Sequence, residues 1–399
     1  MSVGEIHTRD WHLERKIEIK EGNEKMNVKR IAVIGAGLMG SGISYVSAWS
    51  GYDVTLVDID DSALNRGMAS VQSYLKRGIE KGKMTNLEAD DILKRISTTT
   101  ILEEAVGDAD LVIEAIFENM QAKKKMFKEI DNAARSDAIL ASNTSSLSIT
   151  ELSETTRRPD KVIGMHYFSP VPAMKLLEII IGKKTSEETI QTAISVGEKQ
   201  GKTTVKAKDS PGFIVNRLRA QILRAAILVY EQGLATVEEI DTALKEQYLM
   251  PMGPLELTDF VGLDISFNTM STLHRELGNC FKVPATFKKL VEAGTIGRKA
   301  GRGFYEYGDQ KGEPDQPKGV DPTVLATRII MPYLREAMIE VDTGIATRED
   351  IDKSMKLGTN FKEGPFETIE RLGYELVREE LKKLSSELGD CYSLPEMLQ

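Results

Sequence analysis

The sequence contains few of the residues that usually build metal sites and disulfide frameworks. Its 399 residues include two cysteines, Cys280 and Cys391, and four histidines. The cysteines lack metal-ligand spacing, so we expect no metal site and no disulfide framework. No apolar run approaches the roughly 20 residues needed to span a bilayer, and the charged residues 1–28 include no secretory-type apolar stretch. These absences favour a cytoplasmic protein without a membrane partner.

Positive charge is scarcer than negative charge. Lys and Arg number 52 against 61 Asp and Glu, so the formal net charge is −9 at pH 7. This balance argues against non-specific nucleic-acid binding, although a local basic patch can still hold a phosphorylated ligand. The content of 41% hydrophobic and 28% charged residues is ordinary for a globular protein.

Strands and helices alternate from Lys29 onward. Arg30 to Ile34 is a predicted buried strand, followed by a glycine-rich turn and a helix, and Asp53 to Asp58 is the second strand. This alternation predicts an α/β Rossmann-type, doubly wound parallel sheet. We assign residues 1–28 to a polar N-terminal extension and residues 29–208 to this first domain.

Beyond Asp209 the pattern becomes helical and contains an internal repeat. Five matches share one offset of 111 residues (364 − 253 = 111). The pairs are Gly233-Leu-Ala-Thr236 with Gly344-Ile-Ala-Thr347, Ile240-Asp241 with Ile351-Asp352, Gly253-Pro254-Leu255-Glu256 with Gly364-Pro365-Phe366-Glu367, Gly262 with Gly373, and Pro284 with Pro395. The repeat predicts an all-α domain in two tandem copies, residues 209–312 and 313–399. We expect the copies to pack together as an internal pseudo-dimer, with the chain a monomer or a weak homo-oligomer.

A dinucleotide-binding motif follows the first predicted strand. Gly35-Ala36-Gly37-Leu38-Met39-Gly40 is a complete G-x-G-x-x-G that opens a helix, whose N-terminus would face the phosphates. Asp58 lies 23 residues after Gly35 (58 − 35 = 23), where a carboxylate can bind the adenosine ribose hydroxyls and repel a 2′-phosphate. The pattern predicts NAD as the cofactor, and the alternative is a structural glycine turn with a capping aspartate.

One histidine is placed to act as a general base. His166 ends a short apolar strand, a proline-rich turn follows, and a second strand beginning near Leu176 contains Glu178. In this arrangement His166 can accept a proton near neutral pH, while Glu178 fixes its tautomer. Alone, His166 is more typical of a structural histidine, but a base beside a nicotinamide is what oxidation of a secondary alcohol requires.

From about Val28 to Tyr307 the chain resembles the L-3-hydroxyacyl-CoA dehydrogenases. The matching segments are Gly35–Gly40, Glu114–Glu118, Ser142–Leu147, His166–Glu178, Pro211–Arg217, Met252–Pro254 and Gly301–Tyr305. The doubled helical domain is similar to the dehydrogenase part of multifunctional β-oxidation proteins, where a second copy replaces the other subunit of a dimer. One departure is Ser169, where the family usually has Asn. We expect no hydratase activity, because no enoyl-CoA hydratase domain is present.

The resemblance implies catalytic and substrate-binding roles. His166 would be the general base and Glu178 its partner, while Ser145 and Asn216 would hydrogen-bond the reacting oxygen or His166. Lys81, at the end of a predicted helix, would contact the CoA phosphates. Alone, Ser145 also fits a loop cap, and Asn216 fits a helix hydrogen bond.

The resemblance also implies cofactor contacts. Glu118, Lys123 and Ser145 would lie at the nicotinamide half of NAD, and Asp58 at the adenosine ribose. Alone, Lys123 is more typical of a solvated charge on a helix surface.

The predicted activity is NAD-dependent oxidation of a (S)-3-hydroxyacyl-CoA to the 3-oxoacyl-CoA, and its reverse, in fatty-acid β-oxidation or related acyl-CoA metabolism. The predicted partner is therefore an acyl-CoA substrate, and a separate hydratase or thiolase is an open class of protein partner. Two alternatives stay open: a free hydroxy-acid dehydrogenase of the gulonate type, and a non-enzymatic NAD-binding structural protein.

Overall fold

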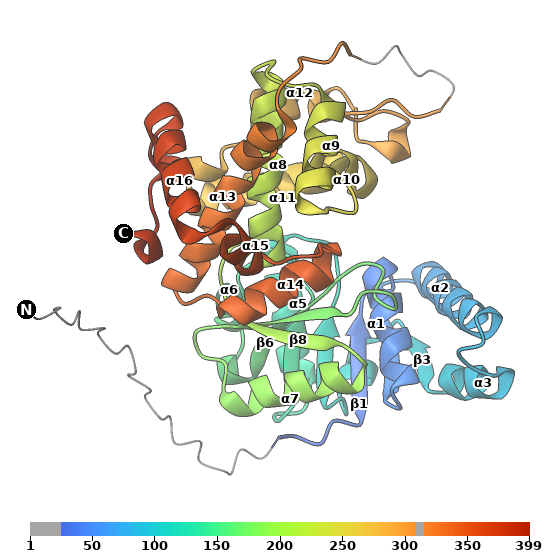
Figure 1. The fold of residues 1–399 in the computed structure, drawn as a ribbon. Coiled ribbons are helices and arrows are strands. Elements are labelled where there is room, and N and C mark those ends of the chain that lie inside the picture. The colour runs from blue at the N-terminus through green and yellow to red at the C-terminus, as the bar shows by residue number, and fades with distance from the viewer. Residues whose placement is uncertain (1–24, 309–314) are drawn as a thin grey trace, which may run out of the picture.

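An eight-stranded sheet forms the first part of the protein (Figure 1). The computed structural model describes residues 25–308 and 315–399, so most of the predicted extension, residues 1–28, lies outside the described residues. The strand order is β3-β2-β1-β4-β5-β6-β7-β8, and neighbouring strands are parallel except for the antiparallel pair β6–β7. The strands are β1 (Arg30–Ile34), β2 (Asp53–Val57), β3 (Ile96–Thr99), β4 (Leu111–Glu114), β5 (Ile139–Ser142), β6 (Val162–Tyr167), β7 (Leu176–Ile181) and β8 (Thr203–Lys208).

Helices connect these strands and enclose the sheet. β4 and β5 are buried along their whole length, as expected for parallel strands that helices cover on both faces. The helices are α1 (Leu38–Trp49), α2 (Asp61–Glu80), α3 (Asn86–Lys94), α4 (Leu102–Val106), α5 (Met120–Ala133), α6 (Ile149–Ser153) and α7 (Glu187–Lys199). The predicted doubly wound fold is confirmed.

The rest of the chain is helical and repeats itself. Three helices of the first copy begin and end 111 residues before their counterparts in the second: α9 before α14, α10 before α15, and α11 before α16. The first copy comprises α8 (Val215–Glu231), α9 (Val237–Tyr248), α10 (Pro254–Val261), α11 (Leu263–Leu277) and α12 (Ala285–Glu292). The second comprises α13 (Pro322–Asp342), α14 (Arg348–Thr359), α15 (Pro365–Leu372) and α16 (Tyr374–Leu388). Within residues 25–308 and 315–399, no helix combines the length and hydropathy needed to cross a membrane.

The two helical copies pack against each other, as the repeat predicts. α8 runs along α13, and the two share an apolar cluster that includes Ile222 and Leu334. Arg217 on α8 forms a buried ion pair with Glu336 on α13, with Nη2 2.6 Å from Oε1. The second copy also contacts the sheet domain, because α14 packs on β7 and β8. Figure 1 shows α14 beside the strand labelled β8. The copies are therefore joined to each other and to the site-bearing strands.

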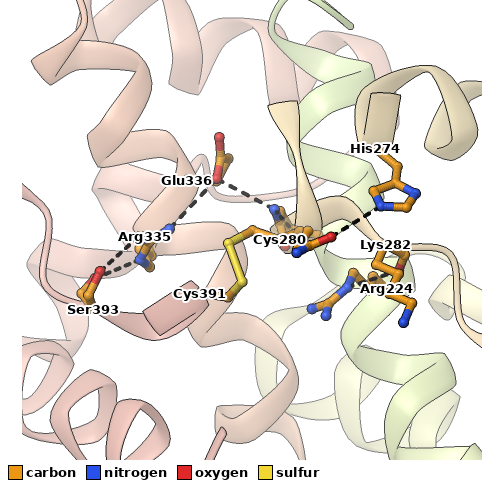
Figure 2. The surroundings of a disulfide bond; sticks show 10 residues. Arg224, His274, Cys280, Lys282, Arg335, Glu336, Cys391 and Ser393 are labelled. Carbon is orange, nitrogen blue, oxygen red and sulfur yellow. Dashed lines mark hydrogen bonds and ion pairs between the residues drawn. A yellow bond between two sulfur atoms is a disulfide. The ribbon is translucent and has the colours of Figure 1, made fainter. Parts of the chain in front are cut away.

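A disulfide links the two copies, so the expectation of no disulfide is wrong. Cys280 and Cys391 are bonded, with their Cα atoms 5.1 Å apart, and their sequence separation of 111 equals the repeat offset. The flanking contacts repeat too (Figure 2): Arg224 donates to the Lys282 carbonyl oxygen and Arg335 to that of Ser393. When two similar units are related by a twofold axis, equivalent positions meet at that axis. Cys280 and Cys391 occupy the same position of the repeat, so each copy supplies one sulfur of the bond. The shared offset was the sequence feature that could have revealed this contact.

Candidate active site

His166 and Glu178 face each other across the antiparallel strands β6 and β7. They are directly opposed in register, so their side chains lie on the same face of the sheet. His166 Nδ1 lies 2.6 Å from Glu178 Oε2, and the Val215 N–H donates to Glu178 Oε1 at 3.0 Å. Both side chains are buried, His166 at 6% and Glu178 at 0% exposure. Since Glu178 holds Nδ1, Nε2 is the nitrogen available to a substrate.

A second group of polar side chains forms around Glu118. Its Oε1 accepts hydrogen bonds from Thr144 Oγ1 at 2.7 Å and from the Ser145 N–H and Oγ at 2.9 and 3.1 Å. Asn216 Nδ2 donates to the Ser145 carbonyl oxygen at 3.3 Å. Burial raises the pKa of Glu118, but the Lys123 ammonium and these hydrogen bonds outweigh burial and hold it below its ordinary value. The structure thus brings together three predicted residues, Glu118, Ser145 and Asn216, as one network.

Lys123 is buried beneath this network, so the solvated position suggested by sequence alone is wrong. It is 1% exposed, and its Nζ lies 2.6 Å from Glu114 Oε1 and 3.5 Å from Glu118 Oε2. Glu114 also accepts a hydrogen bond from Ser142 Oγ at 2.6 Å. A buried ammonium needs a paired carboxylate, and Glu114, a charged residue ending an apolar strand, was the sequence feature that could have revealed the pair. Lys123 acts on the site through Glu118.

The polar groups border a cleft of about 680 Å³ between the sheet domain and both helical copies. Glu118, Ser145, His166 and Asn216 all line it. The first copy adds apolar side chains, namely Met250, Met252, Leu257, Phe260, Val261, Ile265 and Met270, and the second copy adds residues 358–361. Sequence reasoning missed the second-copy residues, although the repeat already indicated that the second copy packs close to the first.

The glycine-rich loop has the geometry that a dinucleotide requires. Gly35 adopts φ +102°, and a Cβ on Gly40 would lie 1.7 Å from the Gly35 carbonyl oxygen, so neither position accepts a side chain. A Cβ on Gly37 would meet nothing within 4 Å, and no side chain caps the N-terminus of α1, where Leu38 and Met39 begin the helix. The space beside Gly37 and the uncapped backbone N–H groups at the start of α1 can therefore accommodate a pyrophosphate.

Two further predicted contacts lie away from the dyad. Asp58 follows β2, and its Oδ2 accepts the Ala36 N–H at 2.6 Å, which fixes the carboxylate beside the glycine-rich loop. Lys81 is exposed at the C-terminal end of α2 and is not among the residues lining the cleft. Its contact with CoA phosphates therefore stays a prediction.

Comparisons with known proteins match the whole described architecture. The family model "3-hydroxyacyl-CoA dehydrogenase, NAD binding domain" matches residues 30–210, and the model "3-hydroxyacyl-CoA dehydrogenase, C-terminal domain" matches residues 212–307 and again 325–399. The chain is 47% identical over 283 residues to a "probable 3-hydroxybutyryl-CoA dehydrogenase" of Bacillus subtilis, a match that covers 71% of this chain and 98% of that protein.

Longer relatives and a solved structure match as well. The chain is 36% identical over 400 residues to a "fatty acid oxidation complex subunit alpha" of Shewanella, covering 95% of this chain but 56% of that protein, so it spans about half of this relative. The crystal structure of 3-hydroxybutyryl-CoA dehydrogenase from Escherichia coli K12 superposes with a TM-score of 0.86 at 28% identity, covering 94% of this chain and 98% of the other.

Proposed function

We propose that His166 and Glu178 carry out the reaction of the 3-hydroxyacyl-CoA dehydrogenases, the family to which this chain belongs. The protein is an NAD-dependent oxidoreductase that interconverts (S)-3-hydroxyacyl-CoA and 3-oxoacyl-CoA. The observation that supports the residue assignment is the buried 2.6 Å contact between His166 and Glu178 in the same cleft as Ser145 and Asn216.

Each residue has a separate task in the reaction. NAD, when bound, supplies the hydride acceptor for C3 of the hydroxyacyl group. His166 Nε2 removes the proton from the 3-hydroxyl group, and the Glu178 carboxylate opposes the positive charge that develops on the imidazole. The Val215 N–H keeps Glu178 in place. Ser145 and Asn216 present fixed dipoles to the reacting oxygen, and in the reverse direction His166 returns the proton.

The residues at the glycine-rich loop and around Glu118 would hold NAD. Gly35, Gly37 and Gly40 shape the loop at the start of α1, and Asp58 beside it is in position to bind the adenosine ribose. Glu118, steadied by buried Lys123, lies next to Ser145 and would contact the nicotinamide half. The carboxylate of Asp58 supports NAD rather than NADP.

We also propose an oligomeric state, a class of protein partner and a location for this protein. Packing of the two copies supports a chain that works as a monomer or weak homo-oligomer. Likeness to the alpha subunit of fatty acid oxidation complexes makes a separate hydratase or thiolase a candidate partner. The cytoplasm is the proposed location, since acyl-CoA and NAD are supplied there.

The direct test measures NADH oxidation with acetoacetyl-CoA and with free acetoacetate. We expect turnover on the thioester alone, and we expect His166→Ala and Glu178→Gln to lower kcat by roughly 10²–10⁴-fold while NAD still binds. His274→Ala is the matched control, because His274 hydrogen-bonds Asn279 and does not line the cleft. Equal turnover of the free acid, or full activity of Glu178→Gln, would contradict the proposal.

A further inference from the structure

Arg219 is a cation on the wall of the cleft that the reaction does not use. It follows Asn216 by three positions on α8, so it lies on the same helix face and about 4.5 Å further along the axis. Both residues line the cleft. Among the lining residues of the described chain, Arg219 is the sole lysine or arginine. When the reacting oxygen of a substrate lies at Asn216, the rest of its acyl chain can therefore reach this guanidinium.

Arg219 has no counter-charge in the described part of the chain. Among residues 25–308 and 315–399, no carboxylate lies within 4.0 Å of its guanidinium, although Arg217, two positions earlier, pairs with Glu336 at 2.6 Å. The ionisable groups that share the cleft are already engaged: Glu118 by Thr144 and Ser145, and His166 by Glu178. Burial lowers the pKa of Arg219, and no acid offsets this effect. A half-buried cation without a partner is unfavourable, so its presence needs an explanation other than packing.

The repeat provides an internal comparison for this position. The residue 111 positions after Arg219 is Ile330 on α13, and it is 1% exposed. The two helices pack against each other as equivalent elements, so this place in the helical domain accepts an apolar side chain. Packing therefore does not require a guanidinium, and the difference between the two copies is that only Arg219 borders the cleft.

We propose that Arg219 binds a carboxylate at the far end of the acyl chain, which makes 3-hydroxyacyl-CoA substrates with a terminal carboxylate the preferred class. The inference rests on the proposed function, since the roles of His166 and Asn216 fix where C3 lies. Arginine binds carboxylates through two parallel hydrogen bonds. The surrounding wall is apolar, with Leu223 and Met250 among its residues, and suits the methylene groups between C3 and the carboxylate. A CoA phosphate is the other anion the substrate carries, and the apolar wall favours the acyl end.

The test compares two substrates of equal acyl length in the NADH assay. 3-Oxoadipyl-CoA ends in a carboxylate and 3-oxohexanoyl-CoA in a methyl group. We expect wild-type kcat/KM to be higher for 3-oxoadipyl-CoA. Arg219→Leu should lower it about 10–100-fold for that substrate and leave or raise it for 3-oxohexanoyl-CoA. Arg219→Lys should retain part of the preference. Arg224→Leu is the matched control on the same helix, because Arg224 contacts the Lys282 carbonyl oxygen outside the cleft.

Each other outcome has a distinct meaning. An equal loss on both CoA substrates, with none on the N-acetylcysteamine thioester of acetoacetate, would assign the anion to a CoA phosphate and overturn the proposal. Unchanged selectivity in an Arg219→Leu protein of normal thermal stability would also overturn it. If Arg219→Leu does not fold, the wild-type enzyme decides: a higher kcat/KM for 3-oxoadipyl-CoA supports the proposal, and an equal or lower value overturns it. Activity on acetoacetyl-CoA separates these results from failure of the proposed function, which would abolish turnover on every thioester.

Discussion

Gly358 of the second helical copy packs on Val215, the residue whose N–H holds Glu178. A Cβ on Gly358 would lie 3.0 Å from Val215 Cγ2 and 3.0 Å from Leu176 Cδ2. The second copy therefore touches β7 and the start of α8, the two elements that carry Glu178 and its hydrogen-bond donor Val215. The absence of a side chain at residue 358 is what permits this close approach.

Enlarging this glycine should move α14 away from the dyad. We expect Gly358→Leu to lower the free energy of unfolding by about 1–3 kcal/mol and to reduce kcat more than it affects NAD binding. The control is Gln247→Leu, because Gln247 is the counterpart of Gly358 in α9 and is exposed. Steady-state kinetics with thermal unfolding would check both variants. A Gly358→Leu protein with wild-type kcat would show that the dyad does not depend on the second copy.

Removal of the Lys123 ammonium should destabilise the protein strongly. Lys123→Met would leave Glu114, which is 0% exposed, as a buried carboxylate without its cation, at a cost of about 3–5 kcal/mol. Lys124→Met is the control, because Lys124 pairs with Glu151 at the surface and such pairs contribute about 0–1 kcal/mol. Chemical denaturation would measure both changes. Adding Glu114→Leu to Lys123→Met should recover stability, and failure to do so would argue that packing rather than charge is responsible.

Lys202 gives the protein a pH-dependent contact next to the site. Its Nζ donates to the carbonyl oxygens of Val171 and Met174, in the turn between His166 and Glu178. Burial, and secondarily the charge of Lys175, lowers the pKa of Lys202 to about 8. Its unfolded value is about 10.4, so between these values the unfolded chain binds more protons and stability rises with pH.

The corresponding measurement compares wild type with Lys202→Met. As the pH rises from about 8 to about 10.4, the free energy of unfolding of the wild type should increase relative to that of Lys202→Met. Lys202→Met should also lower kcat/KM by loosening the turn that carries Ser169 and Pro170, which line the cleft. A difference that stays constant with pH would mean that Lys202 titrates alike in the folded and unfolded chains.

Loss of the disulfide should affect stability more than activity. The bond joins residues 111 apart, and a native disulfide typically stabilises a protein by about 2–5 kcal/mol. The Cys280→Ser/Cys391→Ser double variant and the wild type in dithiothreitol should therefore share one unfolding temperature, which is lower than that of the oxidised wild type. Their kcat should stay near that of the oxidised protein. Differential scanning calorimetry in both redox states would check this. Identical unfolding of the oxidised and reduced wild type would exclude a stabilising role.

Patterns that are local in sequence, or that repeat, predicted most of the fold. The glycine-rich motif and the alternation around it predicted the sheet domain, and the 111-residue offset predicted the doubled helical domain. The strand, proline-rich turn and strand from Val162 to Glu178 predicted that His166 and Glu178 lie together. The features that were missed depend on packing between distant segments. Whether Lys123 is solvated or buried depends on Glu114, and the disulfide depends on how two equivalent helices meet. Ser145 and Asn216 were placed by resemblance, and the structure shows them bonded to each other.

The joining of the two helical copies in one chain also affects how the sequence can evolve. In a symmetric dimer of identical subunits, a substitution appears in both subunits at once, and the new residue must be tolerated in two places. Here positions 247 and 358 are equivalent in the repeat but encoded separately. One is Gln in solvent and the other is Gly against the sheet. Arg219 and Ile330 also differ at equivalent positions, so the tandem arrangement allows one copy to carry a polar residue at the cleft while the other keeps an apolar residue in the packed core.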